Sequence, residues 1–314
     1  MIAGYLAGRY NPARVVSLKF LLPPMAFLMI FIMVFPSNLS SLLKLKLYVY
    51  PMMVSFILFI SSPFLAYTVS YIIPDKFHFL KTGIIISSSV PPYAMLSAWT
   101  GFLEGDILLT LIIQSFSSFI ALFIMPFGLP LLFEASSYFS VKVLMQNLSF
   151  LVVFPFVLGV LLKLIFRRFF TPGILKRIKP TLSSVSGIIE IIIILISVAL
   201  RAEIITDNPV IILWGFFTAS LYYAVCFILA IYVSKVFKLS YETAIPLIYQ
   251  NGSKNLSVAM VVAITSFESQ AMLGVAACIL AQFPASALFF SVTTRFLAFN
   301  DFYSTAEKVQ NKDE

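Results

Sequence analysis

The most constraining feature of the sequence is a series of apolar runs, each about twenty residues long, that recurs along the whole chain. A run of that length allows an α-helix to cross the hydrocarbon of a bilayer. Hydrophobic residues make up 61% of the 314 residues and charged residues only 11%. An ordinary soluble domain is about half apolar and about a quarter charged. We therefore expect an all-α membrane protein.

The apolar runs predict nine membrane spans, and no polar stretch is long enough for a separate soluble domain. The chain is therefore expected to be a single transmembrane domain over residues 1–314. Residues 1–8 are apolar but too short to cross, and they look like the remnant of a tenth helix. Residues 300–314 are expected to form a cytoplasmic tail. The predicted spans cover residues 18–35, 47–73, 80–103, 107–132, 143–165, 182–200, 209–233, 241–267 and 271–298.

The lysines and arginines of the loops predict the orientation, because cytoplasmic loops carry the excess of positive charge. With a cytoplasmic C-terminus, thirteen of these residues lie inside and seven outside, and the cluster from Lys163 to Lys179 decides the balance. Nine spans then leave the N-terminus outside. For a prokaryotic source, this describes a multi-pass protein of the cell membrane. These loops also explain the net charge of +8, so no nucleic-acid partner is expected.

Two of the predicted spans contain residues that a continuous membrane helix tolerates poorly. The third span contains Pro91 and Pro92, each of which removes a backbone donor. The eighth contains the run from Gln250 to Asn255, in which Gly252 and its polar neighbours make a poor helix interior. Freed backbone groups at membrane depth survive only when they are buried in protein or line a watery cavity. Both runs are therefore predicted to be helix breaks.

The two breaks occupy equivalent positions in spans that run through the membrane with opposite orientation. Matched interruptions of this kind point to the substrate or ion site of an inverted-repeat transporter. The alternative is a simple kink in one span and a helix–helix contact in the other. Under the first interpretation, the candidate substrate contacts are the hydroxyl and amide side chains of Ser88, Ser89, Tyr93, Ser97, Asn251, Ser253, Gln114 and Gln282.

Lys254 and Glu190 are the charged residues that lie well inside predicted spans, where charge is costly and usually functional. Lys254 cannot snorkel to the surface, because its side chain reaches about 6 Å and the interface is roughly 15 Å away. Its ammonium could instead replace a bound cation near the carbonyl ends of the preceding half-helices. Glu190 could pair with Lys254 or face a substrate cavity. Gln250 and Asn255 complete the candidate ion-coupling set.

Metal-ligand clusters and nucleophile–base pairs are not visible in the sequence, so we expect neither a metal cofactor nor enzymatic activity. Cys226 and Cys278 lie alone in apolar segments and are expected to pack as small core residues. Glu104 and Asp106 follow the third span and are expected to be solvated at a cytoplasmic helix junction.

The segments around both breaks resemble the bile-acid:sodium symporter superfamily, and among its members most closely the arsenite carriers. The run from Pro92 to Asp106 (Pro-Tyr-Ala-Met-Leu-Ser-Ala-Trp-Thr-Gly-Phe-Leu-Glu-Gly-Asp) is similar, without a gap, to the arsenite carriers' Cys-Ile-Ala-Met-Val…Trp…Gly-Asp segment. Residues 254–259 (Lys-Asn-Leu-Ser-Val-Ala) are similar to their Asn-Asn-Phe-Glu-Leu-Ala. Span number and spacing agree over nearly the whole chain.

The resemblance implies a helical bundle of two inverted repeats, over about residues 1–133 and 141–299. It also implies a core domain with two crossed broken helices, a panel domain facing it, and a substrate bound in the crevice between them.

The chain departs from the family pattern at the positions that determine which solute or ion is bound. The arsenite carriers' cysteine falls at Pro92 and their glutamate at Ser257, so the thiolate ligand for arsenic(III) is missing. The sodium symporters' Glu-x-x-x-Gln-Asn pattern begins here with Gln250, and Lys254 replaces one sodium ligand. A site that loses a negative charge and gains a positive one is expected to bind sodium poorly.

The leading hypothesis is a secondary active transporter of a small organic anion that works by alternating access, independently of sodium, with a proton or no coupling ion. One alternative is a sodium-coupled organic anion symporter, and another is an arsenite or metalloid exporter with oxygen ligands. From a different class, the chain could be a channel or membrane receptor on a carrier scaffold. The expected partners are a small-molecule substrate and the lipid bilayer, and no oligomeric state is predicted.

Overall fold

The computed structural model describes residues 2–35, 48–132, 141–169, 172–207, 209–267 and 269–310. Throughout these residues the regular structure is helical, and the one pairing of extended backbone is an isolated bridge between Pro92 and Lys254. The all-α fold class predicted from the apolar runs is confirmed. The loops predicted at residues 36–46 and 133–140 lie outside the described residues.

The helices vary from four to thirty-nine residues in length. In chain order they are α1 (Ile2–Tyr10), α2 (Pro12–Ser17), α3 (Leu22–Val34), α4 (Val49–Ser70), α5 (His78–Ser89), α6 (Ala94–Phe102), α7 (Ile107–Phe123), α8 (Leu129–Leu132), α9 (Val141–Leu148), α10 (Phe154–Phe169), α11 (Pro172–Ala199), α12 (Ala202–Asp207), α13 (Val210–Val236), α14 (Tyr241–Tyr249), α15 (Leu256–Ser266) and α16 (Met272–Gln310). Short 3-10 turns cover Lys19–Leu21, Asp75–Phe77 and Ser269–Ala271, and π-helical turns cover Ile124–Gly128 and Ser149–Val153.

Several helices are apolar enough to lie in a membrane. Within the described part of the chain, four are also long enough to cross it, namely Pro12–Ile32, Val49–Ser70, Val210–Val236 and Met272–Thr293. Shorter apolar helices cover Ile107–Ala121, Phe154–Phe166, Ser184–Ala199 and Leu256–Ser266. The third and eighth predicted spans are each divided into two short helices, so neither counts as one long span. The chain is a helical, multi-pass membrane protein, and the count of nine spans remains a prediction.

Both ends of the described chain are helical. The predicted remnant forms α1, which packs closely on α11, since a Cβ added to Gly4 or Gly8 would lie 2.6 Å or 2.0 Å from a carbonyl oxygen of that helix. Small residues permit such close approach. At the other end, α16 continues to Gln310, well beyond the predicted end of the last span at residue 298. The loss of apolar character marks the end of a membrane span, but it does not end the helix.

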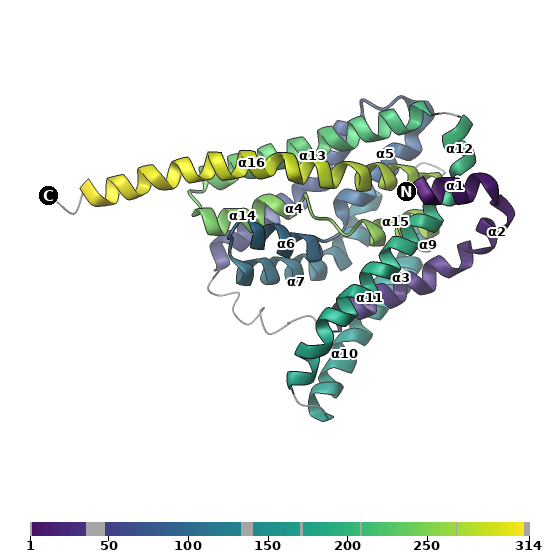
Figure 1. Cartoon of the computed structure of the whole chain (residues 1–314), viewed down its shortest axis with the longest axis horizontal. Helices are drawn as coiled ribbons and strands as arrows, with labels where there is room; N and C mark the ends of the chain where they lie inside the picture. Colours follow the sequence, from purple (N-terminus) through teal and green to yellow (C-terminus); the bar gives the residue numbers. More distant parts are fainter. Residues whose placement is uncertain are drawn as a thin grey trace.

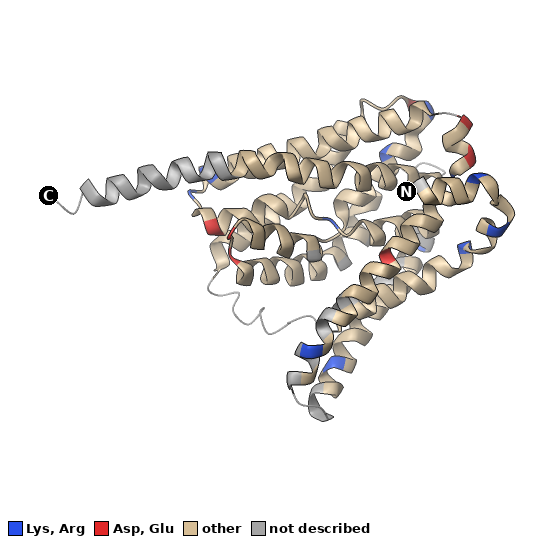
Figure 2. Ribbon diagram, viewed as in Figure 1, with Lys and Arg blue, Asp and Glu red and all other residues tan. Residues whose placement is uncertain are grey.

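Figure 1 shows two groups of helices. In one group α3, α10 and α11 run side by side, and the other group consists of α4 to α7 with α13 to α16. Helix α15 contacts both α3 and α11, so it lies where the two groups meet. In Figure 2, charged residues lie mainly near helix ends, and most of the length of the helices is uncharged. Exposed apolar side chains such as Leu213 and Phe217 fit a surface that contacts lipid.

Two glycines hold α5 tightly against α16. A Cβ added to Gly83 would lie 2.1 Å from the carbonyl oxygen of Ala271, and one added to Gly274 would lie 2.4 Å from that of Leu80. Both oxygens belong to the backbone, so neither can swing aside as a side chain would. Because α5 leads directly into the first break, this contact fixes the point from which that break begins.

Gly83→Ala should lower the thermal stability of the purified protein in detergent. A Gly→Ala change inside a helix normally gains about 1 kcal/mol of helix propensity, but overpacking costs about 1–3 kcal/mol and should reverse the sign. Gly187→Ala is the matched control, because nothing lies within 4 Å of its added Cβ. If the two variants melt at the same temperature, the close packing of α5 on α16 is wrong.

Candidate functional site

Two helices are broken in the interior of the protein, at the two runs predicted from the sequence. Break 1 comprises residues 90–93, between α5 and α6, and break 2 comprises residues 250–255, between α14 and α15. In break 1, Val90 is extended, with φ −75° and ψ 151°, as the residue before a proline prefers. In break 2, Asn255 caps α15, and its side-chain oxygen accepts a 3.3 Å hydrogen bond from the amide of Val258.

The two breaks cross and pair with each other as a minimal antiparallel ladder. The amide of Tyr93 donates to the carbonyl oxygen of Ser253 over 2.9 Å, and the amide of Asn255 donates to that of Pro91 over 2.9 Å. Backbone groups that a broken helix leaves open cannot rely on water at membrane depth. Each break therefore pairs some of the backbone groups that the other leaves open.

Pro92 and Lys254 lie opposite each other between these two hydrogen bonds. In this position the backbone groups of both residues point away from the partner break. Pro92 has no N–H, so no donor is stranded on its side. Lys254 has both groups, and the carboxamide of Gln282 on α16 meets them. Gln282 Oε1 accepts from the Lys254 N–H over 3.1 Å, and Nε2 donates to its carbonyl oxygen over 3.4 Å.

A second glutamine, Gln114 on α7, holds break 1. Its Nε2 donates to the carbonyl oxygen of Tyr93 over 2.9 Å and to the hydroxyl of Ser97 over 3.0 Å. Each glutamine thus lies on the helix that follows a broken pair and bonds to the backbone of that break. Gln114 and Ser97, predicted as substrate contacts, are engaged with each other and with break 1.

The side chain of Lys254 is buried, with 3% exposure, and reaches into the helix group that carries the breaks. Its Nζ lies 4.3 Å from the ring centroid of Phe59 on α4, which is a cation–π contact. Within the described residues, Nζ has no hydrogen-bond partner, and no ion pair joins it to Glu190. The predicted possibility that these two residues pair is therefore not realised.

Glu190 faces a cavity of about 560 Å³ between α11 and the crossed breaks. Apolar side chains such as Ile191, Leu256 and Phe283, from α11, α15 and α16, form much of its wall. Of the two positions predicted for Glu190, the structure has the one beside a cavity, and a role in substrate binding stays a prediction. The polar lining residues are Glu190 on α11, Lys254 in break 2, Tyr93, Ser184 and Gln282.

Hydroxyl groups surround the carboxyl group of Glu190. The phenol of Tyr93 shares a 2.9 Å hydrogen bond with the hydroxyl of Ser186, which lies one turn before Glu190 on α11. The hydroxyl of Ser257, at the start of α15, interacts with the carboxyl group but forms no hydrogen bond of ordinary geometry. The carboxyl group therefore has polar neighbours but no cation paired with it in the described part of the chain.

Ser88 and Ser89 were predicted to contact the substrate, but they do not line this cavity. Both hydroxyls donate to the carbonyl oxygen of Ile85 in their own helix, over 2.6 Å and 2.9 Å. A serine in the last turn of a helix can satisfy its hydroxyl locally in this way. Hydroxyl content alone therefore overestimated what break 1 offers to a ligand.

The polar side chains of break 2 mainly tie it to α4. Gln250 accepts from the hydroxyl of Ser55 over 2.7 Å and donates to its carbonyl oxygen over 3.0 Å. Asn251 donates to the carbonyl oxygen of Leu58 over 3.0 Å. Its side-chain oxygen and the hydroxyl of Ser253 are buried and have no partner in the described structure. Of the break 2 candidates, Lys254 lines the cavity.

Gly252 is required in break 2 by the ring that covers it. A Cβ added here would lie 2.3 Å from the tip of Phe227. That ring is held in place, since it stacks on Phe289 with centroids 4.7 Å apart. A residue with any side chain would therefore displace the break or the ring.

The sequence prediction missed Ser184, Ser186 and Met95. Ser186 precedes Glu190 by one helical turn, so both project from the same face of α11. A small polar residue four positions before a carboxylate inside an apolar run was the available signal. Met95 lines the cavity from α6, and an isolated methionine in an apolar run gives no such signal.

Asp106 is more than the solvated junction residue that the sequence suggested. Its carboxylate accepts from the phenol of Tyr48 over 2.7 Å and from the amide of Leu109 over 2.9 Å, and its own amide donates to the carbonyl oxygen of Glu242. The hydrogen bond to Asp106, with burial, raises the pKa of Tyr48 to about 12. Asp106 thus joins the starts of α4, α7 and α14, whereas Glu104 is exposed.

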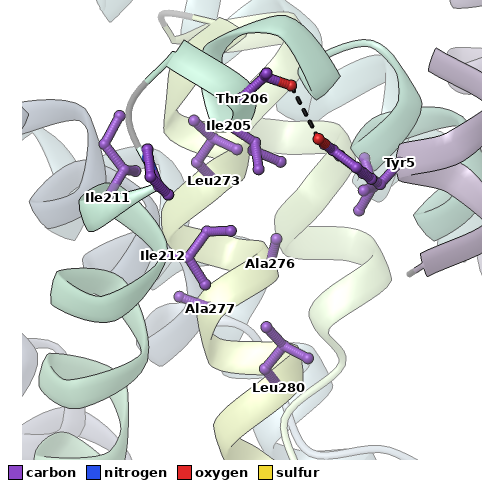
Figure 3. A pocket seen from close by; sticks show the side chains of 11 residues that line it. Tyr5, Ile205, Thr206, Ile211, Ile212, Leu273, Ala276, Ala277 and Leu280 are labelled. Atoms are coloured by element: carbon purple, nitrogen blue, oxygen red, sulfur yellow. Dashed lines mark hydrogen bonds between the residues drawn. The ribbon is translucent and has the colours of Figure 1, made fainter. Parts of the chain in front are cut away.

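A second cavity of about 460 Å³ lies beside the N-terminal part of α16 (Figure 3). Its lining is almost wholly apolar and includes Leu273, Ala276 and Leu280, and at one side the phenol of Tyr5 lies 3.0 Å from the hydroxyl of Thr206. It offers space but few polar groups. The chemistry that could select a solute is concentrated in the cavity beside the breaks.

Comparison with known proteins identifies the family. Residues 23–208 match the model of the Sodium Bile acid symporter family, a stretch that includes break 1 and Glu190. The uncharacterized protein YbaS of Bacillus subtilis (strain 168) is 27% identical over 265 residues, which cover 83% of this chain and 84% of that protein. Members of the family are transporters and not enzymes, so a small-molecule substrate and a bilayer environment are implied. The chain belongs to the sodium bile acid symporter family.

Proposed function

We propose that this transporter is a secondary active carrier of a small organic anion, that it works by alternating access, and that it does not use sodium. The observation that carries the proposal is the buried ammonium of Lys254 at the crossing of the two breaks. The ammonium of Lys254 would take the place that a bound ion occupies in a carrier of this plan, either as a fixed cation or as the group that exchanges a coupling proton.

Electrostatics support independence from sodium. A sodium ion about 4 Å from the ammonium would be repelled by about 4 kcal/mol at an effective dielectric constant of about 20. In the described residues, no carboxylate of break 2 offsets that repulsion, because the position that resembles the symporters' glutamate is Gln250. Both the oxygen and the nitrogen of the Gln250 carboxamide also bond to Ser55 on α4.

Two structural features support alternating access by an inverted repeat. Gln114 and Gln282 have matching roles, since each follows a broken pair and bonds to the backbone of its break. The cavity is formed by α11 from one helix group and by the breaks, α15 and α16 from the other. Rocking of one group against the other would open this cavity to either side of the membrane.

The lining of the cavity supports an organic anion with an apolar part. Lys254 contributes to one wall with its ammonium buried behind that wall against Phe59, and apolar side chains cover much of the remainder. Glu190 on the facing wall would repel an anion unless it were protonated, because like charges repel strongly where water is scarce. Binding of the anion and of a proton would then favour each other, with Tyr93 and Ser257 as polar neighbours of the carboxyl group.

Lys254→Gln should reduce uptake at least about tenfold, the loss expected when one charged contact worth about 1.5–3 kcal/mol is removed. Uptake is measured in proteoliposomes with a panel of small radiolabelled organic acids and one conjugated bile acid, with external sodium or choline. Lys76→Gln is the matched control, because Lys76 is exposed and its Nζ also lies over a ring, 4.9 Å from the centroid of Phe77. Strict sodium dependence, or full activity of Lys254→Gln, would contradict the proposal.

Glu190→Gln should flatten the pH dependence of uptake. In the unaltered protein, uptake of an anion should rise as the external pH falls, since protonation of Glu190 removes the repulsion. The glutamine variant carries no charge at any pH and should lose this response. Glu203→Gln, an exposed residue on α12, is the control. An unchanged profile in Glu190→Gln would rule this residue out, and a profile flattened only in Lys254→Gln would assign the proton to the lysine.

A further inference from the structure

The crossed breaks have one outer edge that presents both a donor and an acceptor and one that presents an acceptor alone. Because Pro92 and Lys254 are the pair between the two ladder hydrogen bonds, their own backbone groups face outward. Proline has no N–H to satisfy. The Lys254 edge presents both an N–H and a C=O in the protein interior, where leaving either one unpaired is costly.

We infer that Gln282 is a positioning residue that takes the place of a third strand at this edge and thereby fixes Lys254 at the crossing. A carboxamide is the side chain that carries a donor and an acceptor in the arrangement of a peptide group. Gln282 Oε1 lies 3.1 Å from the Lys254 nitrogen, and Nε2 lies 3.4 Å from its carbonyl oxygen. One side chain thus meets both backbone groups of Lys254 and is the partner of its N–H, while the carbonyl oxygen also accepts from the amide of Leu256 over 3.0 Å.

The neighbours of Gln282 determine the orientation of its carboxamide. Oε1 also accepts a hydrogen bond from the phenol of Tyr223 on α13 over 3.2 Å, and Nε2 lies 3.5 Å from the sulfur of Met95 on α6. A flipped carboxamide would set its NH₂ group against the N–H of Lys254, donor against donor. The side chain is 4% exposed, so it is held from α6, α13 and break 2 together.

Helix α16 holds both breaks in position, and Gln282 is its link to break 2. Gly83 and Gly274 lock α16 to α5, the helix that leads into break 1, and Gln282 locks the same helix to break 2. Gln282 also lines the cavity beside Glu190. A bound solute would therefore touch the residue that holds the backbone of Lys254. This role differs from the direct substrate contact predicted from the sequence, and it does not depend on the identity of the substrate.

Hydrogen–deuterium exchange of the full chain in detergent tests this role without a substrate. Gln282→Met keeps the length of the side chain and removes both hydrogen-bonding groups. The amide of Lys254 should then exchange about tenfold faster, as expected for one lost buried hydrogen bond. The change should be confined to peptides covering break 2, with α10 as the reference, because a general loss of stability would raise exchange in both.

Two further variants make the test specific. Gln282→Glu keeps an acceptor for the Lys254 amide and should retain most of its protection, which also provides a test if Gln282→Met does not fold. Gln114→Met should leave break 2 unchanged, because Gln114 donates to a carbonyl and a hydroxyl and protects no amide there. Unchanged exchange at break 2 in Gln282→Met, equal exchange in the Met and Glu variants, or an unprotected Lys254 amide in Gln282→Glu would each overturn the inference. Since no solute is transported in this experiment, its failure would be distinct from failure of the proposed function.

Discussion

The mutual pairing of two broken helices is the constraint on which the site depends. A helix that stops inside a membrane strands amides and carbonyls where water cannot reach them. Here the stranded groups of break 1 and break 2 meet each other through two 2.9 Å hydrogen bonds. Neither break could persist alone at that depth. The glycines that bring α5 against α16 and the glutamines that follow each broken pair hold the crossing in place.

The crossing determines what kind of charge the protein can hold at its centre. Lys254 is one of the two residues that face each other between the ladder bonds, so the position of its backbone is set by pairing. Its ammonium is left with an aromatic face and without a hydrogen bond in the described residues. Burying an ammonium without a hydrogen bond costs free energy, and such a cost is consistent with a functional cation. It also makes this member of the sodium bile acid symporter family a candidate for transport that does not depend on sodium.

The predictions that held were those based on local chemistry. Proline and glycine interrupt helices for reasons contained in their own bonds, so both breaks could be placed from the sequence. Predictions based on composition were weaker. Ser88 and Ser89 looked like ligand contacts because they are hydroxyls near a break, but each bonds to the carbonyl of Ile85. Asp106 looked like a solvated loop residue, yet it accepts from Tyr48, which is 58 positions away in the chain.

The sequence by itself determined that the chain is helical and lies in a membrane, that two helices are interrupted, and that the interrupted segments carry an unusual lysine. These features follow from the length of apolar runs and from the covalent limits of single residues. The tertiary structure decided that the two breaks pair, that Lys254 turns toward Phe59 while Glu190 faces a cavity, and that Gln282 completes the crossing. Such outcomes depend on how helices rotate and approach one another, and that is settled by packing between residues far apart in the chain.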